Sequence, residues 1–86
     1  MDYIIIIDNG KDLTTLKFAN MNVRDKYWQD VCMAENYINI YKAVFRGGRN
    51  PLITLEECPK SKKGKCLCKK IMNKQVGDII NIQDKE

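Results

Sequence analysis

The chain has 86 residues, of which 44% are hydrophobic and 30% charged, with a formal net charge of +4. These values are ordinary for one small globular domain, and they exclude collagen-like, coiled-coil and disordered chains. The longest unbroken aliphatic run, Ile4 to Ile7, is too short to cross a membrane. The N-terminus also lacks the basic residues and the small-residue cleavage site of a secretory signal. We therefore expect a cytoplasmic protein whose four cysteines remain thiols.

The first elements predicted along the chain form a β-hairpin over residues 2–19. Four consecutive isoleucines, Ile4 to Ile7, indicate a strand that is buried on both faces and therefore central in a sheet. Residues 8–11 have the sequence Asp-Asn-Gly-Lys, which predicts a turn because Asn and Gly tolerate the positive φ angles of hairpin connections. A second strand is expected to follow and to end near Ala19.

A helix is predicted next, with Asn22 as its N-cap, and it extends at least to Met33. Apolar residues recur at intervals of three and four, which indicates the side of the helix that faces the core. Charged residues, among them Arg24 and Asp25, are expected on the solvent side. The apolar stripe comprises Val23, Tyr27, Val31, Ala34, Ile38, Tyr41 and Phe45.

Two interpretations remain for the residues after Met33. In the first, the helix continues to Phe45 and ends at the glycine pair 47–48. In the second, residues 37–45 form a strand, because they are rich in β-branched and aromatic residues, and a turn at residues 46–49 leads into the next strand.

The remaining elements are short. Pro51 places a strand over residues 52–55 at the edge or the start of pairing, residues 66–75 suit either a short helix or a strand, and residues 78–83 suit a final strand. The sequence thus predicts an α+β fold, in which a small, mainly antiparallel sheet of an N-terminal β-hairpin and later strands packs on one principal helix. One domain spans residues 1–86, with a basic, cysteine-containing segment at 58–74.

The basic residues are concentrated in one part of the chain. Residues 60–74, the lysine segment, contain seven lysines and no acidic residue, whereas the rest of the chain has 8 basic and 11 acidic residues. Such a segment favours contact with a nucleic-acid backbone or an acidic protein surface, and the alternative is a solvated face that aids solubility. The candidate contact residues are Lys60, Lys62, Lys63, Lys65, Lys69, Lys70 and Lys74, extended by Arg46 and Arg49.

Three of the four cysteines lie around the lysine segment with the spacing C-x7-C-x-C. Four thiolates are a common ligand set for structural zinc, but the usual C-x2-C spacing is missing. The alternatives are a redox pair, favoured by neighbouring lysines that lower a thiol pKa, and ordinary core thiols. We expect no cofactor, with zinc as the alternative, and its candidate ligands are Cys32, Cys58, Cys66 and Cys68.

Aromatic residues gather in and after the predicted helix. Tyrosine and tryptophan are favoured at interfaces because they bury a large area and keep a polar atom. Trp28 and Tyr37, with Tyr41 beside them, are therefore a candidate partner-binding patch, and the alternative is that they fill the core.

The sequence disfavours catalysis. It contains no histidine, which removes the commonest general base, and no glycine-rich phosphate loop. We expect a small non-enzymatic interaction protein, an inhibitor or adaptor, that binds a larger protein or nucleoprotein partner through the basic loop and the aromatic-rich helix. The alternative is a direct nucleic-acid-binding protein that zinc stabilises. Frequent Lys, Ile and Asn indicate an AT-rich gene of a bacterium, a phage or a virus. The expected location is therefore the cytoplasm of a bacterial, phage-infected or virus-infected cell.

Overall fold

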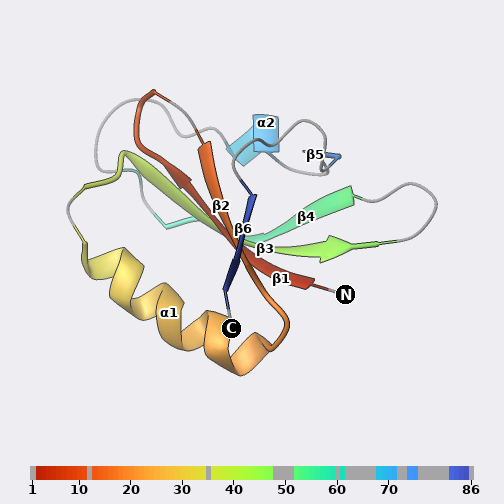
Figure 1. The fold of residues 1–86 in the computed structure, drawn as a ribbon. Coiled ribbons are helices and arrows are strands. Elements are labelled where there is room, and N and C mark those ends of the chain that lie inside the picture. The colour runs from red at the N-terminus through yellow and green to blue at the C-terminus, as the bar shows by residue number, and fades with distance from the viewer. Residues whose placement is uncertain are drawn as a thin grey trace.

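One sheet with a helix packed against it forms the body of the protein (Figure 1). The computed structural model describes residues 2–11, 13–34, 36–47, 52–59, 61, 68–71, 74–75 and 82–85. In these residues no helix has the length and apolar character needed to span a membrane. The elements are β1 (Asp2–Asp8), β2 (Leu13–Phe18), α1 (Met21–Met33), β3 (Asn39–Arg46), β4 (Leu52–Glu57), α2 (Cys68–Ile71), β5 (Lys74–Gln75) and β6 (Ile82–Lys85).

The strand order confirms the predicted α+β fold. The order of the described strands in the sheet is β5-β4-β3-β1-β2-β6. The first five strands in this order, from β5 to β2, each pair with the next in antiparallel orientation. β6 joins β2 in parallel, with Thr15 opposite Ile82. The predicted hairpin is present, since β1 pairs with β2 from Tyr3–Phe18 to Asp8–Leu13. β1 also pairs with β3 along its whole length, so the isoleucine strand is central as expected.

The isoleucines of β1 divide the core into two clusters because successive side chains of a strand point to opposite faces. Ile5 packs with Leu16, Phe18 and Trp28 on the face that α1 covers, which we call the helix face. Ile4 and Ile6 pack on the other face, which we call the α2 face, because α2 contributes its buried side chain there. Figure 1 shows the two helices on opposite sides of the sheet.

The N-cap of α1 is Asn20 rather than the predicted Asn22. Asn20 has an extended backbone, and its side-chain oxygen accepts hydrogen bonds from the backbone N–H groups of Asn22 (2.7 Å) and Val23 (3.4 Å). These are two of the N–H groups that a helix start leaves without intrahelical partners. The helix therefore begins two residues earlier than the sequence pattern indicated, at Met21.

The buried side of α1 also differs from the predicted apolar stripe. Arg24 and Trp28 are the buried residues of the helix, whereas Val23 and Tyr27 are exposed. Because consecutive helical residues are about 100° apart, this corresponds to a rotation of the helix by roughly one residue from the predicted orientation. The sequence pattern failed here because Arg24 was counted as a solvent residue.

The strand interpretation holds for the residues after α1. The helix ends at Met33, Ala34 adopts an extended backbone, and the Tyr37 hydroxyl donates to the Cys32 carbonyl near the helix end. β3 then begins, after the Ile38 N–H donates to the Asp8 carbonyl at 2.8 Å. A central strand between β1 and β4 suits the β-branched and aromatic residues of this segment.

The C-terminal elements agree with the sequence in type and differ in extent. The segment 66–75 contains both of its alternatives, the single turn α2 and the short strand β5. The final strand is β6 at residues 82–85, later than the predicted 78–83, of which residues 78–81 lie outside the described ones.

Gly10 lies in the connection between β1 and β2 with a φ of +93°, a conformation that side-chain-bearing residues rarely adopt. The Asp8 carboxylate accepts from the Gly10 N–H at 2.9 Å and from the Asn39 side-chain amide at 3.1 Å. The connection is thereby fixed to the start of β3. A Cβ at Gly10 would lie 2.6 Å from the Ile38 Cδ1 atom, so the Ile38 side chain would have to shift to accommodate it.

We expect Gly10→Ala to lower the free energy of unfolding by about 1–2 kcal/mol, because alanine is strained at positive φ and its Cβ displaces Ile38. Gly47→Ala is the matched control, since among the described residues a Cβ there meets only the Phe45 ring, at 3.8 Å. Urea denaturation measures both variants. Equal effects of the two substitutions would contradict this account of the turn.

Candidate interaction surfaces

The structure describes part of the lysine segment. Lys69 and Lys70 belong to α2 and Lys74 belongs to β5, while Arg46 is exposed at the end of β3. The other predicted contact residues, Lys60, Lys62, Lys63, Lys65 and Arg49, lie outside the described residues.

α2 attaches the lysine segment to the sheet. Its Ile71 side chain is 2% exposed and packs with Ile4, Ile6 and Ile53 on the α2 face. Full burial of an isoleucine side chain stabilises a fold by about 1.5–3 kcal/mol. The backbone of the segment is therefore held against the domain at this point.

The sheet register brings two predicted contact residues to one end of β4. Arg46 on β3 pairs with Leu52, and Leu52 pairs with Gln75 on β5, next to Lys74. Neighbouring strands lie about 4.8 Å apart, so β3 and β5 are separated at this end by the width of a single strand, β4. Arg46 and Lys74 are thus one strand apart in the sheet but stand in adjacent rows of the register, not in the same row.

The sheet separates the cysteines that the sequence offered as zinc ligands. Cys32 packs on the helix face, whereas Cys58 and Cys68 pack on the α2 face. Cys66 lies outside the described residues. Because zinc binds thiolates at about 2.3 Å, Cys32 does not share one ion with the other two. No group of three cysteine or acidic side chains suited to a metal ion occurs in the described part of the chain.

The aromatic residues predicted at a contact surface are buried. Trp28 and Tyr37 are each 8% exposed and pack in the core of the helix face, and Tyr41 is buried on the α2 face. They take the alternative role of core residues, because a small domain needs large apolar side chains to fill its interior. Tyr27, predicted within the core stripe, is 40% exposed and lies against the Phe18 ring.

A groove lies on the helix face beside α1. It has a volume of about 360 Å³ and is open to solvent. Tyr27, Val31 and Ala34 line it from the helix side, and Ile7 and Leu16 line it from the sheet. Asp30 and Asn36 add polar groups. Sequence reasoning found the helical residues of this groove as an apolar stripe but assigned them to the core, so the groove itself was missed.

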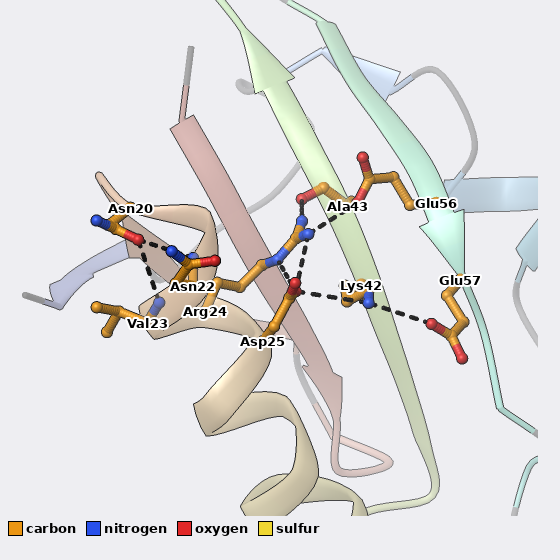
Figure 2. A network of polar contacts seen from close by, with 9 residues as sticks. All are labelled: Asn20, Asn22, Val23, Arg24, Asp25, Lys42, Ala43, Glu56 and Glu57. Carbon is orange, nitrogen blue, oxygen red and sulfur yellow. Dashed lines mark hydrogen bonds and ion pairs between the residues drawn. The ribbon is translucent and has the colours of Figure 1, made fainter.

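A buried arginine joins α1 to β3 and β4. Arg24 is 1% exposed, and one of its Nη atoms donates to the Ala43 carbonyl at 2.8 Å. The other Nη atom lies 2.9 Å from a Glu56 carboxylate oxygen and 3.0 Å from an Asp25 oxygen, as Figure 2 shows. The guanidinium carbon is 5.2 Å from the centre of the Tyr3 ring, a cation–π distance. The buried guanidinium thus contacts a carbonyl oxygen, two carboxylates and an aromatic ring, which together replace its contacts with water.

Lys42 extends this network along the sheet. Its ammonium nitrogen lies 3.5 Å from Asp25 and 3.3 Å from Glu57, and 5.7 Å from the centre of the Trp28 ring (Figure 2). The register of β4 shifts at this point, so that Glu56 is an extra residue between the pairs that Glu57 and Leu55 form with β3. This bulge brings two successive carboxylates to the same network.

Tyr37 stabilises the end of α1. Its hydroxyl donates to the Cys32 carbonyl at 3.0 Å, one of the carbonyls that the helix end leaves without an intrahelical donor. Burial, with a smaller contribution from Cys32, raises the pKa of the Tyr37 hydroxyl above its ordinary value of 10.0. The hydroxyl therefore remains a donor throughout the physiological pH range.

Comparisons of this chain with protein-family models, curated proteins and solved structures found no match.

We expect Arg24→Ala to lower the free energy of unfolding by about 2–4 kcal/mol, because it leaves a cavity and removes the donor to the Ala43 carbonyl. Lys26→Ala is the matched control, since Lys26 carries the same charge on the same helix but is exposed. We expect a change below about 0.5 kcal/mol there. Urea unfolding of both variants measures the difference, and similar losses would show that burial of the guanidinium is unimportant.

A pH dependence follows from Tyr37. At pH 8, Tyr37→Phe should lower stability by about 0.5–1.5 kcal/mol through loss of the hydrogen bond. Because the pKa is higher in the folded protein than in the unfolded chain, the contribution of this group is complete below pH 10. The contribution of the hydroxyl to stability declines as the pH rises from 10 through the pKa of the folded protein. The difference in free energy of unfolding between the wild type and Tyr37→Phe should therefore disappear. Urea titrations at about pH 8 and 11 measure the two differences, and a constant difference would contradict the assignment.

Proposed function

We propose that this chain is a non-enzymatic interaction protein, an inhibitor or adaptor, that binds an acidic surface of a larger protein through its lysine segment. The observation that carries the proposal is the separation of charge along the chain. Residues 60–74 hold seven lysines without an acidic residue, while the remainder has an excess of acidic residues. A segment of this kind attracts acidic partners and accelerates their association.

The contacts of the remaining charged residues support this assignment. Arg24 and Lys42 are surrounded by three carboxylates, those of Asp25, Glu56 and Glu57. These two cations contribute to the stability of the fold and are already compensated. The lysine segment, by contrast, has no acidic residue among its own 15 positions.

The attachment of the lysine segment to the sheet should make its binding more favourable than that of an unattached lysine-rich tail. The buried Ile71 and the pairing of β5 with β4 fix two points of its backbone. A segment that is partly fixed before binding loses less conformational entropy when a partner orders it. The same electrostatic argument supports the alternative partner, a nucleic-acid backbone, which the test below distinguishes.

We expect the protein to bind a fluorescein-labelled polyglutamate peptide more tightly than a labelled 20-base-pair DNA duplex of similar charge, measured by anisotropy. The variant Lys62→Glu with Lys63→Glu should slow association by roughly tenfold or more, because it reverses charge within the segment. The measurement is repeated at about 50 and 200 mM salt, where electrostatic binding changes strongly.

The matched control is Lys11→Glu with Lys26→Glu, which changes the net charge equally at two exposed lysines outside the segment. If the control variant slowed association as much as the first variant does, net charge and not the lysine segment would govern binding. Tighter binding of the DNA duplex would reject an acidic protein as the partner and support the nucleic-acid alternative.

A further inference from the structure

We propose that the groove beside α1 is a second binding site, which takes a short peptide segment of a partner protein with apolar side chains next to a lysine or arginine. This site is distinct from the lysine segment, because it lies on the helix face and is formed by α1, β1, β2 and the residues that follow α1. The inference does not depend on the function proposed above.

The walls of the groove suit apolar side chains. Leu16 and Ile7 of the hairpin and Val31 and Ala34 of the helix form an almost continuous apolar lining. Tyr27 borders it, half-exposed, with its ring tilted against Phe18 at a centroid distance of 5.4 Å. A tyrosine held in this way offers a large contact area at a small entropic cost.

The volume favours a few side chains of a peptide. A groove of about 360 Å³ lies at the lower end of the range for ligand pockets, roughly 300–1,000 Å³. It is open to solvent rather than enclosed, so an extended or helical segment can enter without a change in the fold. Exposed apolar residues continue from Tyr27 towards the helix start, at Val23 and Met21, and lengthen the apolar surface.

The electrostatics of the groove favour a cation. Asp30 is exposed on the groove side of α1, and its carboxylate forms no ion pair with the described residues. The groove also lies along the C-terminal half of α1, where the helix dipole is negative and the last turn contains no basic residue. The Asp30 carboxylate and the helix dipole therefore make the electrostatic potential negative on the α1 side of this apolar groove. A lysine or arginine beside an apolar side chain complements both.

The test begins with a phage-displayed library of random 12-residue peptides, selected against the purified full chain. We expect enriched sequences that combine apolar residues with lysine or arginine. One such peptide, labelled with fluorescein, is then titrated against variants. Tyr27→Ala should weaken binding at least tenfold, because it removes the largest contact of the groove. Asp30→Asn should weaken it about three- to tenfold and reduce its dependence on salt.

Gln29→Lys is the matched control for Asp30→Asn. Both substitutions raise the net charge by one at exposed positions of α1, but Gln29 does not line the groove. We expect Gln29→Lys to leave the peptide affinity within twofold. The variant Lys62→Glu with Lys63→Glu should also retain the peptide, so failure of this inference is distinguishable from failure of the proposed function.

Three outcomes would overturn the inference. The first is a selection that enriches no peptide, or enriches acidic ones. The second is a basic, apolar peptide whose affinity is unchanged in both Tyr27→Ala and Asp30→Asn. The third is a dimer of the chain in solution whose interface contains Tyr27, since a second copy would then occupy the groove. Native circular dichroism of each variant confirms that an effect on binding does not come from unfolding.

Discussion

The position of α1 on the sheet depends on the compensation of one buried positive charge. Arg24 lies almost fully out of solvent, and a guanidinium in that position is stable only when carbonyl and carboxylate oxygens replace its water. Those oxygens come from Ala43, Glu56 and Asp25, so the arginine fixes the helix against two strands at once. Residues one helical turn apart share a face, and Trp28 therefore also points inward. The same rotation turns Tyr27 away from the core and towards the groove. The apolar groove on the outside is thus a consequence of the charge on the inside.

The groove and the attachment point of the lysine segment lie on opposite sides of the sheet. The lysine segment is attached through Ile71 on the α2 face, whereas the groove with the exposed residue Asp30 lies on the helix face. The two proposed sites therefore share no residue.

The sequence predicted the elements better than it predicted the orientation of the helix. The hairpin and the central isoleucine strand follow from local signals, namely Asn-Gly at a turn and a run of β-branched residues. Between residues 37 and 45 the helical period and the β propensity disagreed, and pairing with β1 and β4 decided for the strand. The face of α1 was mispredicted because the partners of Arg24 lie on β3 and β4, far along the chain, where periodicity gives no information. Trp28 and Tyr27 exchanged their expected roles for the same reason. No pattern in the sequence indicated the groove, since it is formed by residues of several different elements.

The parallel pairing of β6 with β2 has a consequence for the newly made chain. β2 leaves the ribosome early, whereas its neighbour on this side among the described strands consists of residues 82–85. During most of synthesis the outer edge of β2 therefore has free N–H and C=O groups, which are a template for pairing with other chains. A charged side chain within a strand is one of the devices that discourage such pairing. Lys17 stands within β2, opposite Asp84 in the finished sheet. Lys17 is a side chain of this kind, on the edge that residues 82–85 cover in the finished sheet.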